Sequence, residues 1–229
     1  MINLAIYAIS DLHLTNEFDE MANRFGTGWR EQIREAWLDH IGAEDVVLLP
    51  GDISWAKTWT HFQPDLDFIA ALPGTKVLSR GNHDHYWKSK AKMEELLPAG
   101  VIALEQSSVE IADHVIVGIK GWLTPDHRFY DSQVDEKYYQ RERGRLERTL
   151  EDISPSQRPI IAMTHFPPCA QPAEVGFRDL LQQYKVTHSV YGHLHGGDWV
   201  NRTEGLHKTV RYHLVSADFL QFKPKIIVA

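Results

Sequence analysis

Short apolar runs alternate with amphipathic stretches along the chain, and this alternation predicts the fold class. Runs of strand length, typical of strands buried on both faces, occur at Leu4–Ile9, Val46–Leu49, Lys76–Leu78, Pro159–Met163 and Thr187–Tyr191. Between them, apolar side chains spaced three or four positions apart predict helices over Trp29–Ile41, Trp59–Leu72, Trp87–Leu97 and Phe177–Tyr184. Alternating strands and helices imply βαβ units and a mainly parallel sheet.

Two further stretches contain short β-like runs and predict a second sheet packed against the first. The first stretch has runs at Val101–Leu104, Ser107–Ile111 and Val115–Ile119. The second, Asp198–Val228, repeats the pattern with runs at Trp199–Val200, His207–Val215 and Lys225–Val228. No linker, low-complexity tract or solenoid repeat interrupts the chain, so we predict one domain over residues 1–229.

One charged stretch, Asp135–Ile153, predicts a helix with a thin apolar stripe. Its alternating arginines and acids favour a solvated surface helix. Gly144 lies inside this stretch and costs about 1 kcal/mol relative to alanine. The helix therefore either depends on tertiary contacts or breaks at Gly144.

Bulk composition argues against several classes of protein. The net charge of −7 disfavours a general nucleic-acid binder, which needs a basic face. The single cysteine, Cys169, allows no intrachain disulfide framework and fits a reducing compartment. The first apolar run lacks the basic flank of a signal peptide, and no run is long enough to span a bilayer. We therefore expect a cytoplasmic protein with no membrane partner; its oligomeric state stays open.

Polar motifs follow the apolar runs at the points where the predicted strands end. They are Asp11-Leu12-His13, Gly51-Asp52, Gly81-Asn82-His83-Asp84, His165 and Gly192-His193-Leu194-His195. Because the carboxyl ends of parallel strands lie along one edge of a sheet, we expect these motifs to converge. In an extended chain, residues i and i+2 point the same way, so Asp11 and His13 can reach one cation together. The glycines permit positive φ and close backbone approach.

Taken singly, these motifs are weak, since an Asp-x-His pair is common on surface turns. Together they offer the carboxylate, amide and imidazole ligands that suit two divalent cations, a known device for attacking phosphate esters. The other histidines lack such context, although His85 and His127 are candidates for lining a pocket. Cys169 follows His165 by four residues, so a thiol nucleophile is an alternative, but hydrolysis by two metals needs none.

In these motifs and their order the chain resembles the calcineurin-like metallophosphoesterases, whose pattern is D-x-H, G-D, G-N-H-[DE], H and G-H-x-H. All five blocks are present between residues 11 and 195. The segments Val215–Phe219 and Phe222–Lys225 are also similar to a bacterial subgroup of predicted phosphohydrolases. The resemblance implies the metallophosphatase fold, a four-layer α/β/β/α sandwich of two mixed β-sheets flanked by helices.

The resemblance also assigns the metal ligands residue by residue. It implies that Asp11, His13 and His195 hold one cation, that Asn82, His165 and His193 hold the other, and that Asp52 bridges both. The family uses manganese, iron, zinc or similar ions, and the mixed nitrogen and oxygen ligands suit first-row metals better than calcium or magnesium.

Three further residues receive catalytic roles from the same resemblance. His83 would face the leaving group and either donate a proton or stabilise the departing alkoxide. Asp84 would orient the His83 ring and favour its charged form. Arg80 matches an arginine that clamps phosphate in some relatives, and its alternative is an ordinary surface arginine.

The predicted function is hydrolysis of phosphate mono- or diesters of a small molecule by a hydroxide bridging two divalent metals. Alternatives are a nuclease of the same fold, which the acidic charge opposes, a protein phosphatase, and a non-catalytic scaffold, which usually loses its ligands. Inserts at the strand ends carry aromatic side chains that either stack on a substrate or seal the loops. These inserts are Thr15–Trp29, Ser54–Trp59, Tyr86–Trp87, Trp122–Tyr130 and Phe166–Phe177.

Overall fold

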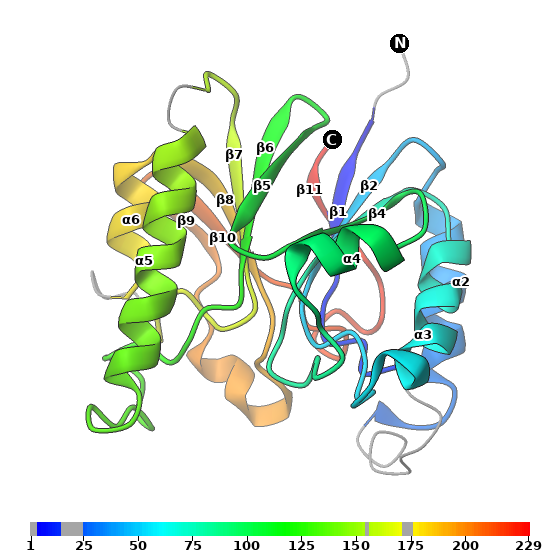
Figure 1. The fold of residues 1–229 in the computed structure, drawn as a ribbon, viewed down its shortest axis with the longest axis horizontal. Coiled ribbons are helices and arrows are strands. Elements are labelled where there is room, and N and C mark those ends of the chain that lie inside the picture. The colour runs from blue at the N-terminus through cyan, green and yellow to red at the C-terminus, as the bar shows by residue number, and fades with distance from the viewer. Residues whose placement is uncertain (1–3, 15–24, 154–155, 171–175) are drawn as a thin grey trace.

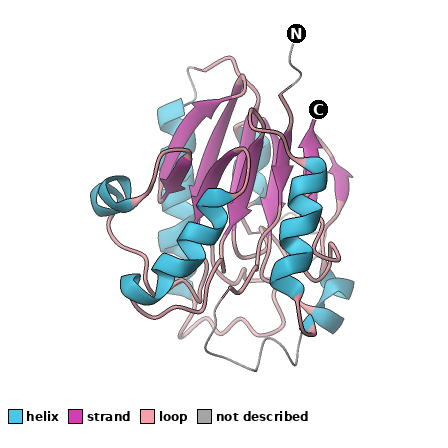
Figure 2. Cartoon of the chain, turned by 90° about the vertical axis from the view of Figure 1, so that its right-hand side faces the viewer, coloured by secondary structure: helices cyan, strands magenta, loops and turns pink. Residues whose placement is uncertain are grey.

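A computed structural model describes residues 4–14, 25–153, 156–170 and 176–229. Two β-sheets pack face to face, and each outer face is covered by helices (Figure 1). Figure 2 shows the same layers from the side, with helices in front of and behind the strands. The predicted four-layer α/β/β/α sandwich is confirmed. Part of two predicted aromatic inserts, including Phe18, lies outside the described residues.

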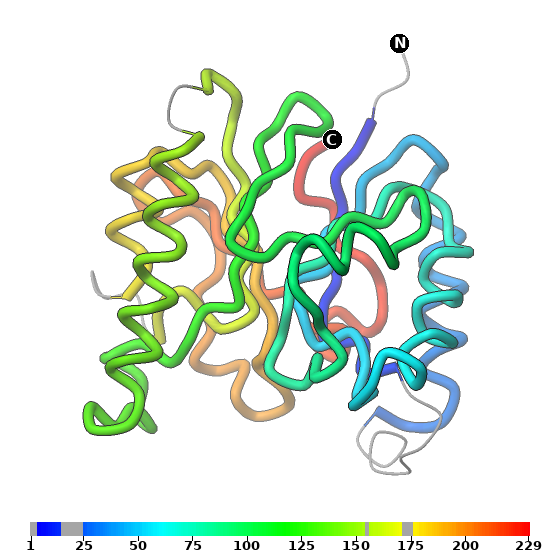
Figure 3. Tube along the Cα trace, in the orientation of Figure 1, coloured from blue at the N-terminus to red at the C-terminus, as the bar shows by residue number. Residues whose placement is uncertain are grey.

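The first sheet has the strand order β11-β1-β2-β3-β4. Four strands are parallel: β1 (Ile6–Ala8), β2 (Val46–Pro50), β3 (Thr75–Ser79) and β4 (Val101–Leu104). The last strand, β11 (Lys225–Val228), returns antiparallel to β1, so the blue and red parts of the trace lie side by side in Figure 3. The helices that cover the first sheet are α2 (Trp29–His40), α3 (Trp59–Ala71) and α4 (Lys90–Leu96).

The second sheet has the strand order β5-β6-β7-β8-β10-β9. Its parallel centre is β6 (His114–Ile119), β7 (Ile160–Thr164), β8 (Val186–Tyr191) and β10 (Val210–Leu214). Antiparallel edges are β5 (Ser107–Ile111) and β9 (Gly205–His207). This sheet is covered by α5 (Glu136–Ile153) and α6 (Arg178–Gln183).

The central strands are apolar throughout because both of their faces are buried. In β2, Val46 and Leu48 join the core between the sheets, whereas Val47 and Leu49 join the core under the helices of the first sheet. This is the period of two that a strand imposes. Each such side chain contributes about 1.5–3 kcal/mol when fully buried. The continuous apolar runs thus fix the layer order.

Three sequence predictions for the β-rich stretches are wrong. Val101–Leu104 and Lys225–Val228 belong to the first sheet, not to a separate second one. Trp199 and Val200 lie in a 3-10 helix, η1 (Gly196–Asn201). The run His207–Val215 divides into β9 and β10 around a turn at Lys208, whose φ of 54° ends the first strand.

The charged helix α5 is continuous through Gly144 and is more than a solvated surface element. Tyr139, Leu146 and Leu150 are buried against the second sheet, and the helix contacts β6 and β5. Glu142 is buried too, and Arg145 Nη1 donates to its Oε1 at 2.6 Å. Tertiary packing therefore supports the glycine. No helix in the described ranges has both the length and the apolar character needed to cross a membrane.

Candidate metal centre

The polar motifs converge where strands from both sheets end, on the lower side of the view in Figure 1. Asp11, Asp52 and Asn82 follow β1, β2 and β3 of the first sheet. His165 and His193 follow β7 and β8 of the second sheet. The cluster therefore lies across the junction of the two sheets, which the predicted single sheet edge did not anticipate.

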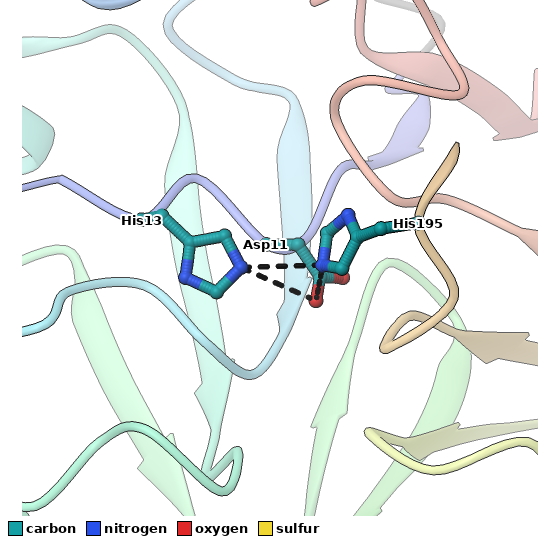
Figure 4. Close-up of side chains that lie close together, drawn as sticks. All are labelled: Asp11, His13 and His195. Carbon is teal, nitrogen blue, oxygen red and sulfur yellow. Dashed lines mark hydrogen bonds and ion pairs between the residues drawn. The ribbon is translucent and has the colours of Figure 1, made fainter. Parts of the chain in front are cut away.

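One group of candidate ligands is Asp11, His13 and His195 (Figure 4). His195 Nε2 lies 3.2 Å from Asp11 Oδ1 and 3.2 Å from His13 Nε2. His13 Nε2 lies 3.9 Å from the same Asp11 oxygen. These three donor atoms lie within 4.8 Å of one another, and Asp11 and His13 are fully buried. The geometry suits one shared cation.

The second group is Asn82, His165 and His193, with Asp52 beside it. Asn82 Oδ1 lies 2.8 Å from His165 Nε2 and 3.0 Å from His193 Nδ1. Asp52 Oδ2 lies 3.3 Å from His165 Nε2. Ligand atoms of Asp11, Asp52 and His165 also lie within 4.8 Å of one another, so the two groups are continuous. All seven ligands predicted from the sequence are thus in one cluster.

Four of these side chains are directed into the cluster by left-handed backbone conformations and not by extended strands. The φ angles are 56° at Asp11, 46° at His13, 50° at Asp52 and 71° at His193. The expectation that Asp11 and His13 meet because an extended chain repeats every two residues is therefore wrong. Non-glycine residues rarely adopt this region, and strained residues gather at functional sites.

Two of the predicted glycines are required by close packing against the carboxylates. A Cβ on Gly81 would lie 2.0 Å from Asp52 Oδ1, and a Cβ on Gly192 would lie 2.1 Å from Asp11 Oδ2. Any side chain at either position would displace a candidate ligand. Gly51 is also closely packed, because a Cβ there would lie 2.7 Å from Gly81 Cα and 2.8 Å from His165 Nδ1, and its φ of 89° lies in the left-handed region.

Neighbouring groups orient two of the histidine rings. His165 Nδ1 lies 3.1 Å from the Pro50 carbonyl oxygen, and His195 Nδ1 lies 3.0 Å from Asp218 Oδ1. An Nδ1–H that donates to such an acceptor directs Nε2 at the cluster, and a cation that binds there would replace any proton on Nε2. Asp218 was not identified from the sequence as a site residue.

Charge in the cluster is divided between two carboxylates and two imidazoles. Burial opposes ionisation of Asp11 and Asp52, but nearby histidines outweigh it and hold both pKa values well below their usual range. Burial also opposes protonation of His195, yet Asp11 and Asp218 raise its pKa to about 10. Likewise Asp52 and Asp11 outweigh burial and raise the pKa of His165 to about 9.

The other two histidines are neutral. Burial lowers the pKa of His13 to about 4, and burial together with His165 lowers that of His193 to about 3. Neutral imidazole and ionised carboxylate are the states in which these groups bind cations. His13 differs in one detail, because its Nδ1 accepts a hydrogen bond from Trp55 Nε1 at 2.5 Å. Ligation through Nε2 requires the proton on Nδ1 and therefore a small shift of the indole.

His83 lies at the edge of the cluster and keeps 35% of its side chain exposed, with Nε2 3.9 Å from Asp52 Oδ2. Trp55 stacks on its ring, with centroids 4.4 Å apart and an interplanar angle of 16°. Trp55 thus contacts both His83 and His13. The sequence placed Trp55 among loop aromatics but carried no sign of this contact.

The expected role of Asp84 as the partner of the His83 ring is wrong. Its carboxylate is fully buried and accepts from the backbone N–H groups of Asp52, Ile53, Ser54 and Gly81 and from Tyr86 Oη. Asp84 therefore ties the loops after β2 and β3 together. Burial lowers the pKa of His83, so the charged ring is not favoured either. Arg80 is half-buried, and nothing in the described ranges accepts from its buried Nε.

Comparison with known proteins gives the class to which this fold and cluster belong. The family description "Calcineurin-like phosphoesterase" matches residues 4–218, and the chain belongs to that family. Members are metal-dependent phosphoesterases, so the chain is assigned to this class of hydrolase. No functionally curated protein matches the chain in sequence.

Solved structures share the fold at low identity. Phosphopantetheinyl hydrolase from Mycobacterium tuberculosis has a TM-score of 0.62 at 17% identity, covering 98% of this chain and 96% of that one. A protein of unknown function from Aquifex aeolicus has a TM-score of 0.54 at 16% identity, with the same coverage. A purple acid phosphatase from yellow lupin has a TM-score of 0.51 at 16% identity, covering 99% of this chain and 45% of that one. At such identities the likeness establishes the fold alone.

Proposed function

We propose that this chain hydrolyses phosphate mono- or diesters of a small molecule at a centre of two divalent cations, manganese, iron or zinc. The observation that carries the proposal is one cluster of seven candidate ligands, four of them buried, divided into two groups of three with Asp52 beside the second. Paired cations would polarise a phosphate group and lower the pKa of a water molecule when they are bound.

The donor chemistry fits first-row cations. Asp11, His13 and His195 would hold one cation, Asn82, His165 and His193 would hold the other, and Asp52 would contact both. The carboxylates are ionised and His13 and His193 are neutral, while a cation would replace the Nε2 protons of His165 and His195, whose Nδ1 atoms face acceptors. Mixed nitrogen and oxygen donors suit manganese, iron or zinc better than calcium.

The remaining residues supply orientation and hydrogen bonds. His83 is partly exposed beside Asp52, where its neutral ring can donate a hydrogen bond to the leaving oxygen of a bound ester and so stabilise the departing alkoxide. Trp55 restricts the rotation of that ring by stacking on it. Asp84 fixes the backbone of Asp52 and Gly81, and thereby the position of the Asp52 carboxylate that would contact both cations. Arg80 offers a guanidinium that suits a phosphate oxygen.

Asp52→Asn and His83→Ala test the proposed division of roles. Both variants should reduce turnover of p-nitrophenyl phosphate by orders of magnitude, because one removes a ligand charge and the other a hydrogen-bond donor to the leaving oxygen. Only Asp52→Asn should also reduce metal content, measured by elemental analysis. The exposed residue His61 provides a control, and His61→Ala should match the wild type in both measurements.

Equal metal loss in both variants would contradict the assigned roles, and full activity in either would contradict the proposed centre. Bis(p-nitrophenyl) phosphate, measured beside the monoester, separates phosphodiesterase from phosphomonoesterase activity. Failure of the metal-supplemented wild type to cleave either compound would remove the strongest support for hydrolysis.

A further inference from the structure

A cavity of about 610 Å³ opens directly beside the second group of candidate ligands. Asn82 and His193, both members of that group, form part of its wall. A phosphate held at the proposed centre would therefore project its organic group into this cavity. The volume is in the range of sites that enclose drug-sized ligands, about 300–1,000 Å³. The identity of the group that fills the cavity rests on the proposed function, because the cavity and the metal centre would share one substrate.

The cavity wall is mainly apolar and includes the rings of two phenylalanines. Its apolar lining residues in the described ranges are Leu123, Phe129, Phe166, Pro167, Ala170 and Leu194. Phe166 packs against the His193 ring, with centroids 4.2 Å apart and an interplanar angle of 35°, so it lies next to the reacting centre. Phe129 is 67% exposed, an unusual state for so large an apolar side chain.

The charged lining residues already have partners within the wall. Arg128 Nη2 lies 3.1 Å from Asp198 Oδ1, and the Arg128 guanidinium lies 4.4 Å above the Phe129 ring. Asp126 accepts from Thr124 Oγ1 and from the Ala170 backbone N–H. A charged substituent would have to compete with these contacts, whereas an uncharged planar ring would need only the part of the Phe129 ring that Arg128 leaves uncovered.

We propose that this cavity binds an uncharged planar ring in the organic group of the substrate, stacked on Phe129. The substrate class is then a ring-bearing phosphoester, either a nucleotide or an aryl-substituted alkyl phosphate. Phosphates of small polyols and open-chain sugars lack the group that the cavity is shaped to hold. Stacking of this kind tolerates different rings because each has a π face.

Matched substrate pairs separate the ring contact from leaving-group chemistry. Adenosine 5′-monophosphate and ribose 5-phosphate both have a primary alkoxide of a ribose unit as the leaving group and differ by the base. Benzyl phosphate and cyclohexylmethyl phosphate differ mainly in the planarity of the ring. For each pair, the ratio of kcat/KM values in the metal-loaded protein should favour the planar member by about tenfold, as expected for one stacking contact.

Phe129→Ala should reduce that selectivity ratio about tenfold, towards one. Leu38→Ala is the matched control, because Leu38 is a half-exposed apolar residue of α2 outside the cavity, and its ratio should equal that of the wild type. A preference in the nucleotide pair alone identifies nucleotides, and a preference in the benzyl pair alone identifies aryl-substituted esters. Either result supports the cavity as the ring site.

Two results would overturn the inference. One is a ratio near one for both pairs in the wild type, and the other is an unchanged ratio in Phe129→Ala. If p-nitrophenyl phosphate is cleaved in either case, the proposed function stands and only the ring site falls. If no ester is cleaved, calorimetric binding of adenosine 5′-monophosphate and ribose 5-phosphate decides. Equal affinities in wild type and Phe129→Ala then exclude the ring site independently of catalysis.

Discussion

Four of the side chains that we propose as metal ligands, those of Asp11, His13, Asp52 and His193, extend from left-handed backbone conformations. Strain of this kind costs on the order of 1–3 kcal/mol per residue. The surrounding contacts hold it in place: the His193 backbone N–H donates to Asp11, and Ser10 Oγ donates to the same carboxylate. The positions of Asp11 and His193 are therefore fixed by local hydrogen bonds as well as by the strands that precede them.

Gly192→Ala tests how tightly the cluster is packed. The added Cβ would meet Asp11 Oδ2 at 2.1 Å, so the carboxylate must move and metal affinity should fall at least tenfold. Gly197→Ala is the control, because nothing lies within 4 Å of a Cβ there. Isothermal titration calorimetry with the metal measures the affinity of both variants. Equal metal affinities in the two variants would contradict the close packing of Gly192 against the Asp11 carboxylate.

The sequence predicted which residue types form the cluster but not what supports them. The Asp-x-His and Gly-His-x-His spacings are local and contain four of the seven candidate ligands, whereas Asp52, Asn82 and His165 were assigned from the family resemblance. The contacts of Asp218 with His195 and of Trp55 with His13 and His83 join residues 23 to 42 positions apart. No local spacing encodes such a contact, because it depends on how loops pack after the strands have paired.

At the scale of elements, local pattern predicted where strands and helices lie better than which sheet they join. The strands Val101–Leu104 and Ser107–Ile111 match the prediction residue for residue, yet β4 belongs to the first sheet and β5 to the second. Both have short apolar patterns that either sheet could bury. The choice is made by pairing of β4 with β3 and of β5 with β6.

A pair of histidines joins β8 and β10 away from the metal cluster. His188 Nδ1 lies 3.0 Å from His213 Nε2, and the rings are nearly parallel. Burial, assisted by Lys225, His188 and Arg211, lowers the pKa of His213 to about 3. One ring nitrogen donates and the other accepts, so an additional proton on the acceptor would break the bond between these strands.

His213→Gln should make folding less sensitive to acid. As the pH falls below about 6.5, the unfolded chain takes up a proton at His213 that the folded protein excludes until about pH 3, so stability decreases across that interval. Urea unfolding measures the decrease in the free energy of unfolding between pH 7 and pH 4. This decrease should be smaller in the variant by about 1–2 kcal/mol, a figure that allows for screening of the partly buried ring by solvent. His61→Gln should behave as the wild type. An identical pH slope in His213→Gln would exclude this contribution.

At the scale of the whole molecule, each group of candidate ligands draws on both sheets. Asp11 and His13 follow a strand of the first sheet and meet His195 from the second; Asn82 of the first meets His165 and His193 of the second. Bound cations would therefore connect the layers where the apolar core between them ends. The same arrangement gathers strained and charged residues at this junction when cations are absent.

Removal of metal should consequently lower the thermal stability of the entire protein. A ligand at 100 times its dissociation constant stabilises the folded state by about 2.7 kcal/mol. Scanning calorimetry should show Tm falling after chelation and recovering when manganese or zinc is returned. Asp52→Asn should show a smaller difference between the two states. An equal Tm with and without metal would mean that the ions do not connect the sheets.

The pairing of the first strand, β1, with the last strand, β11, has a consequence for synthesis of the chain. β1 is built early, but its antiparallel neighbour β11 and the Asp218 side chain that orients His195 come from residues 218–228. A nascent polypeptide on the ribosome therefore holds Asp11 and His13 without these partners until that segment has emerged. Hydrolytic competence would then arise late in synthesis, and a chain released before Asp218 would lack the carboxylate that orients His195.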